Sequence, residues 1–145
     1  MTTPSNALQV AIYARLKGFS ALTSLLKAPT SVFDFVPESA KPPFVVIGDD
    51  TAIDWSSKSG NGWEATLTIH AWDFEKGGRK SVKAILGAIY DALHRQEASI
   101  AISGFTLVEI AFEFEQTFQE AAAEGQGDRY YHGVQRYRAL IETTS

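Results

Sequence analysis

Hydrophobic residues recur at helical spacing in two separate stretches of the chain. In residues 6–17 the apolar positions cover most of the helix circumference. Ser5 is the expected N-cap of this helix, and Gly18 is its expected end. One side of the helix is formed by Leu8, Ala11, Ile12 and Leu16. The other side carries Val10, Tyr13 and Ala14. A helix that is apolar on two sides needs two buried contacts, so we expect this second side to contact another subunit.

The second helical stretch, residues 79–94, follows the breaker Gly77-Gly78 and is apolar along a single stripe. That stripe consists of Val82, Ile85, Leu86, Ile89 and Leu93. One apolar stripe on an otherwise polar helix is typical of a helix that covers a sheet.

Between and after these helices, apolar and polar residues alternate with the period of two that predicts strands. The expected strands cover residues 32–36, 44–47, 52–57, 63–74, 108–115 and 130–142. In the fifth run, Val108, Ile110, Phe112 and Phe114 alternate with Glu109, Glu113 and Glu115, which predicts one buried face and one acidic, wet face. Residues 119–128 are rich in Ala, Glu, Gly and Gln and are expected to form a mobile loop.

This order of elements predicts a single α+β domain over residues 1–145. Strands joined by short turns pair antiparallel, so we expect an antiparallel sheet, with a mixed sheet as the alternative. The two main helices are expected to pack on one face of that sheet. No internal repeat or linker interrupts the pattern.

Composition narrows the class of protein further. The chain has 145 residues, of which 45% are hydrophobic and 21% charged, with no cysteine and a net charge of −4. These values are those of a globular domain assembled in a reducing cytoplasm, without disulfides or thiolate metal ligands. We see no signal peptide and no membrane span. The acidic balance argues against specific nucleic-acid binding, which draws its affinity from Lys and Arg on phosphates.

The sequence offers no pattern typical of an active site, and we expect no catalytic residue, metal or cofactor. Three histidines, His70, His94 and His132, are scattered over different elements. Asp49, Asp50 and Asp54 lack the spacing of a calcium loop and are interpreted as a solvated turn. Neither a P-loop nor a nucleophile elbow is present.

Two charge clusters of opposite sign lie far apart along the chain. Lys76, Arg79, Lys80 and Lys83 surround the start of the second helix, where positive charge opposes the helix macrodipole. Residues 109–128 hold six acidic side chains and no Lys or Arg. Both clusters are explained either as solvated surface or as functional surface. The basic cluster would contact an acidic neighbour, and the acidic one would repel DNA or dock on a basic partner patch. Opposed patches on one chain suit head-to-tail association, which closes into a ring when the rotation permits.

Taken in order, several short stretches resemble the tail-completion (tail-terminator) proteins of long-tailed phages and gene transfer agents. The stretches are residues 8–16 (LQVAIYARL), 32–37 (VFDFVP), 43–51 (PFVVIGDDT), 65–72 (ATLTIHAW), 78–80 (GRK), 88–94 (AIYDALH) and 132–139 (HGVQRYRA). The resemblance covers nearly the whole chain, apart from the segment 119–128.

This resemblance implies a structural virion protein that forms a six-membered ring at the head-proximal end of the tail tube. Its implied partners are further copies of itself, the major tail tube protein and the neck (connector) protein. Double-stranded DNA would pass through the lumen without specific binding. The implied location is the tail–neck junction of a virion or gene-transfer particle assembled in the host cytoplasm. Within this hypothesis Val10, Tyr13, Ala14 and the four basic residues are the expected subunit contacts, and Glu109, Glu113 and Glu115 are expected to face the lumen.

Two alternatives stay open at this point. The first is a small non-enzymatic binding or adaptor domain that acts as a monomer or dimer in the cytoplasm. The second is an enzyme of small metabolites, which would require an acid–base pair that the sequence does not reveal.

Overall fold

The computed structural model describes residues 2–74, 78–120 and 130–144. In chain order the elements are α1 (Ser5–Lys17), α2 (Ser20–Thr23), β1 (Val32–Phe33), β2 (Phe44–Asp54), β3 (Gly62–Phe74), α3 (Gly78–Leu93), a 3-10 turn (Glu97–Ser99), β4 (Phe105–Glu120) and β5 (Tyr130–Thr143). The strands form one five-stranded sheet in the order β1-β2-β3-β5-β4. β1 pairs parallel to β2 and the other neighbours pair antiparallel, so the sheet is mixed.

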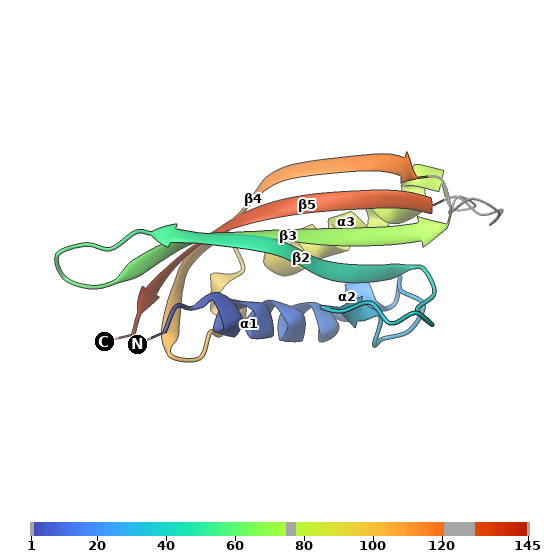
Figure 1. Cartoon of the computed structure of the whole chain (residues 1–145). Coiled ribbons are helices and arrows are strands. Elements are labelled where there is room, and N and C mark those ends of the chain that lie inside the picture. The colour runs from blue at the N-terminus through green and yellow to red at the C-terminus, as the bar shows by residue number, and fades with distance from the viewer. Residues whose placement is uncertain (1, 75–77, 121–129, 145) are drawn as a thin grey trace.

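Both main helices lie against the same face of this sheet, as the sequence predicts (Figure 1). Between them and the sheet lies the core, to which α1 contributes Ile12 and Leu16 and α3 contributes the whole predicted stripe. The opposite sheet face, which α1 and α3 do not cover, is called the open face below. Among the described residues, no helix is long and apolar enough to cross a membrane.

β3 follows the predicted alternation along its length. Leu67, Ile69 and Ala71 are buried under the helices, whereas His70 and Trp72 belong to the open face. β5 continues this pattern, and at Gly133 the missing side chain lets α3 approach the sheet closely. A Cβ on Gly133 would lie only 2.7 Å from Leu86 Cδ1. This contact fixes the depth at which α3 sits on the sheet.

Three predicted boundaries are wrong. Residues 44–47 and 52–57 are not separate strands, because β2 runs unbroken from Phe44 to Asp54 with an irregularity between Ile47 and Asp50. Consequently Asp49, Asp50 and Asp54 lie in a strand and not in a turn.

The strand expected over residues 32–36 is only two residues long, because Phe35 and Val36 leave the sheet and are exposed. Ser5 does not cap α1, since Pro4 holds the N-cap position and the Ser5 hydroxyl donates to Asp50.

A buried polar chain links β5 to its neighbours. The hydroxyl of Tyr137 donates to Gln135 Oε1 at 2.7 Å, and Gln135 Nε2 donates to the backbone carbonyl of Leu86 at 2.9 Å and to Glu115 at 2.8 Å. Burial raises the pKa of Tyr137 above the ordinary tyrosine value. Because each polar group of this chain has a partner, the tight packing of α3 on β5 leaves no buried donor unsatisfied.

Candidate assembly surfaces

The outer side of α1 is the most apolar exposed helical surface among the described residues. Val10 is 60% exposed and faces solvent beside the half-buried Tyr13. A groove of about 350 Å³ runs between α1 and residues 32–35, and at its border Phe35 is 85% exposed. A phenylalanine this exposed beside an exposed valine is the kind of apolar patch that marks a protein contact. Ala14 is also exposed, so all three residues predicted on α1 are accessible to a partner.

The basic cluster lies at the start of α3, with no acidic residue in the first helical turn. The Arg79 guanidinium sits 5.2 Å from the ring centroid of Tyr131, in cation–π geometry. Lys80 and Lys83 are exposed, and none of these three cations forms an ion pair with a described residue. Lys76 lies outside the described residues. The cluster therefore offers unpaired positive charge to an acidic partner.

The expectation of one buried and one acidic face on β4 is wrong. Two irregularities, between Leu107 and Glu109 and between Phe112 and Phe114, interrupt the alternation. As a result Val108 is 41% and Phe114 40% exposed.

The three glutamates of β4 do not share a face. Glu109 pairs with Arg95 and Arg138, and Glu113 pairs with Arg136, across the open face. Glu115 lies opposite Gln135 in the register and bonds to it, on the helix-covered side. What the three share is position on the outermost strand of the sheet. The sequence could not predict these ion pairs, because the arginines come from β5 and the end of α3.

The first half of the outer β4 edge is covered by the chain that leaves α3. The Arg95 amide donates to the Ile110 carbonyl at 2.8 Å, and the Phe112 amide donates to His94 Nδ1 at 3.0 Å. Arg95 adopts the left-handed conformation, with φ of 58°, which ends the helix and turns the chain onto the strand. This arrangement gives His94 a structural role.

Two of the histidines converge on the open face, contrary to the expectation that they are scattered. β3 and β5 bring His70 Nδ1 to 2.8 Å from His132 Nε2, and His132 Nδ1 lies 3.1 Å from Glu120 Oε1. When the carboxylate accepts from His132 Nδ1, His132 Nε2 becomes the acceptor for His70 Nδ1–H, so the chain fixes both tautomers. Burial and the neighbouring His132 lower the pKa of His70. Gly48 makes room for the ring, because a Cβ there would lie 2.6 Å from His70 Nε2.

These rings form the floor of a cavity of about 550 Å³, which we call the aromatic cup. Trp72 stacks on His132 with 3.8 Å between ring centroids, and Phe44 lies beside Trp72 at 6.5 Å. Pro37, Pro42 and Glu38 form the rim. Its described lining residues are mostly apolar or aromatic, and the imidazoles of His70 and His132 bond to each other, so we interpret the cup as an apolar socket with a fixed polar floor. No sequence pattern predicted the cup, since it depends on the register that places Trp72 opposite His132.

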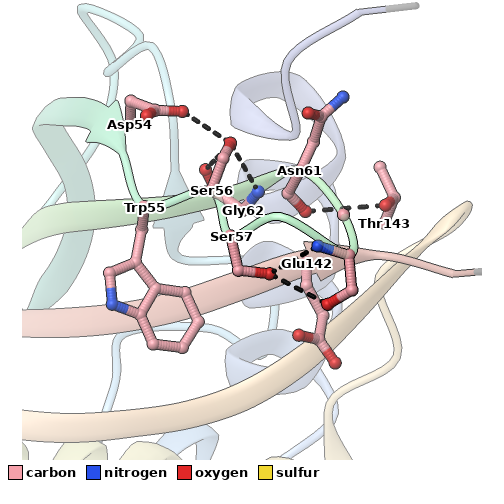
Figure 2. Close-up of a pocket in the computed structure, with 10 residues that line it drawn as sticks. Asp54, Trp55, Ser56, Ser57, Asn61, Gly62, Glu142 and Thr143 are labelled. Carbon is pink, nitrogen blue, oxygen red and sulfur yellow. Dashed lines mark hydrogen bonds between the residues drawn. The ribbon is translucent and has the colours of Figure 1, made fainter.

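A second hollow lies at the tip of the β2–β3 hairpin (Figure 2). Its polar groups are used within the turn: the Ser56 hydroxyl donates to Asp54 at 2.6 Å, and the Gly62 amide donates to Ser56 Oγ at 3.1 Å. Gly62 is required here, because a Cβ would lie 2.6 Å from the carbonyl oxygen of Trp55. We interpret this hollow as the shape of a rigid turn and not as a binding site.

A mixed sheet covered by helices on one face, with exposed apolar residues on α1 and on the loop after β1, leaves surface for contacts with other chains. Residues 10–142 match the family described as "Tail completion protein gp17". The match spans most of the chain, so the protein belongs to this family, which is structural and not enzymatic. The resemblance inferred from the short sequence stretches is thereby confirmed.

Among solved structures, the fold is similar to a chain of the structure titled "Virion of native gene transfer agent (GTA) particle". The TM-score is 0.79 with 24% sequence identity, and the match covers 98% of this chain and 99% of that chain. At this identity the likeness concerns the fold. A comparison with curated proteins gave no match.

Proposed function

We propose that the protein is a structural subunit that forms a six-membered ring at the head-proximal end of a phage or gene-transfer-particle tail. In this position the ring stops growth of the tail tube, offers a surface to the neck protein and lets DNA pass through its lumen. Membership in the tail completion family supports the location. The likeness to a chain from a gene transfer agent virion supports assembly with other virion proteins.

The single structural observation that carries the ring is the distribution of exposed surface. The apolar groove of α1, the unpaired cations of α3 and the glutamates of β4 lie on different elements, so unlike patches of neighbouring copies are available to meet. Contacts between unlike patches are heterologous, and such contacts close into a ring when the rotation per subunit divides the circle.

Mass measurement tests the ring. We expect light scattering of the purified protein, alone or released from assembled tails, to give about six times the 15.9 kDa subunit mass. A projection image of the same sample should show a central hole. A protein that stays monomeric and does not co-purify with tails would contradict the proposal.

We further propose that the β4 edge, with Glu109, Glu113 and Glu115, faces the lumen and keeps passing DNA from sticking. Replacing all three by lysine should slow DNA ejection, because it adds positive charge and also releases the arginines that now pair with Glu109 and Glu113. The measurement is the ejection rate at two salt concentrations, since attraction between the new lysines and DNA weakens in high salt. Asp91→Lys, on the exposed side of α3, is the control. Unchanged ejection in the triple variant would remove the lumen assignment.

A further inference from the structure

The aromatic cup and the β2–β3 hairpin tip lie at opposite ends of the molecule. Figure 1 shows the hairpin projecting beyond one end of the sheet, whereas β2 begins and β3 ends at the other end, where the cup is built. A tip and a cup at opposite ends of one rigid sheet cannot meet within a single chain. Any contact between them therefore requires a second molecule.

The projecting hairpin carries large apolar side chains that the fold does not bury. Ile53 is 59% exposed and Trp55, the first residue after β2, is 42% exposed. Trp55 lies beside the hydrogen-bonded turn, with one edge of its indole next to Gly62 and the rest partly exposed (Figure 2). Trp is the residue type most enriched among side chains that dominate the affinity of protein contacts. A rigid turn that presents a tryptophan is suited to insertion into a preformed cavity.

The cup matches this side chain in size and chemistry. Its volume of about 550 Å³ admits an indole ring, and its walls are the flat apolar surfaces of Phe44, Trp72 and the two rim prolines. Aromatic rings meet favourably edge to face or offset, and a proline ring packs well against an indole. At the polar floor, His70 Nδ1 and both ring nitrogens of His132 already have hydrogen-bond partners, so an apolar guest strips no hydrogen bond from these three atoms.

Charge at the two sites is complementary as well. Lys58 at the hairpin tip and Glu38 at the cup rim form no ion pair within the described part of the chain. Asp54 and Glu142 also line the hollow beside the tip, and Asp54 accepts a hydrogen bond from the Ser56 hydroxyl. Lys58 at the tip of one copy can therefore pair with Glu38 at the cup of another.

We infer that the hairpin tip of one copy docks into the aromatic cup of the next copy, with Trp55 in the cavity and Lys58 on Glu38. This contact rests on the proposed ring and specifies one of its heterologous interfaces. It would make every subunit both donor and acceptor, so a closed ring leaves no cup empty and no tip free.

The test compares wild-type protein with five variants by native mass spectrometry and sedimentation. Trp55→Ala should weaken subunit association by at least about 30-fold, the lower bound for a residue that dominates an interface. Lys58→Glu and Glu38→Lys should each weaken association, and the double variant with both exchanges should recover it. Lys27→Glu, an exposed lysine outside both sites, changes the net charge equally and should leave association unchanged. Circular dichroism of each variant checks that the fold is retained.

The outcomes separate this inference from the proposed function. If wild-type rings form and the single variants assemble as well as wild type, the tip–cup contact is wrong while the ring stands. If the variants form rings but those rings no longer bind tails, the tip serves another virion protein and the inference also fails. A wild-type protein that never associates, alone or on tails, overturns both.

Discussion

Replacing Val10 by aspartate is expected to leave the subunit folded but to prevent ring formation. Val10 is 60% exposed on α1, so the substitution creates no cavity, and valine and aspartate have similar helix propensities. In the assembled ring the same carboxylate would be buried against a partner without a counter-charge, at a cost of about 3–5 kcal/mol per contact. That penalty corresponds to association weaker by roughly two to three and a half orders of magnitude at each contact.

The measurement pairs the thermal unfolding of the purified variant with the assembled mass and with images of tails. Asn6→Asp is the matched control, because it introduces the same charge on an exposed position of the same helix, outside the groove. It places that charge in the first helical turn, where a negative charge is favourable. Normal rings from the Val10 variant would show that the outer side of α1 faces solvent in the particle.

Periodicity predicts an element well when one face is buried uniformly along its length. The stripe of α3 from Val82 to Leu93 is buried throughout, and β3 alternates without interruption, so both were located correctly. In α1 the period is blurred by Val10, Tyr13 and Ala14. The excess of apolar residues predicted a second side that contacts another subunit; Val10 on that side is exposed, and the contact stays a prediction. More apolar residues on a helix than its own core needs thus indicate a surface available to a partner.

Periodicity fails where the strand itself is irregular. The irregularity near Gly48 lets β2 continue through two aspartates that look like a turn, and those of β4 turn Val108 and Phe114 outward. Each extra residue inverts the side-chain direction from that point on, which single-residue preferences do not reveal. The prediction of a mobile loop over residues 119–128 was partly wrong, because Gln119 and Glu120 belong to β4, and residues 121–129 lie outside the described residues.

The candidate site was the part of the structure that the sequence predicted least well. The pairing of His70 with His132 and the stacking of Trp72 on His132 depend on register between strands separated by a helix and a further strand. Taken alone, each of these residues fits the pattern of an ordinary side chain on the open face of the sheet. Only the topology, in which β5 is inserted between β3 and β4, makes them neighbours and adds Glu120 from the far strand.

Leu86→Ala is expected to lower the free energy of unfolding by about 2–5 kcal/mol, because the fully buried side chain packs on the bare backbone at Gly133 and its loss leaves a cavity. Gly133→Ala alone should also destabilise, by about 1–3 kcal/mol, since its new Cβ would lie 2.7 Å from Leu86 Cδ1. Urea unfolding followed by circular dichroism measures both effects.

The double variant is the decisive measurement, because the two changes act on the same space. With the leucine shortened, the methyl group at residue 133 enters the volume that the leucine vacated. The cost of Gly133→Ala should then fall to about zero, giving a coupling energy of roughly 1–3 kcal/mol. Gly87→Ala is the control on the same helix: a Cβ there meets nothing within 4 Å, so it should stabilise by up to about 1 kcal/mol and add independently. Strictly additive losses at Leu86 and Gly133 would mean that α3 does not rest on β5 at this glycine.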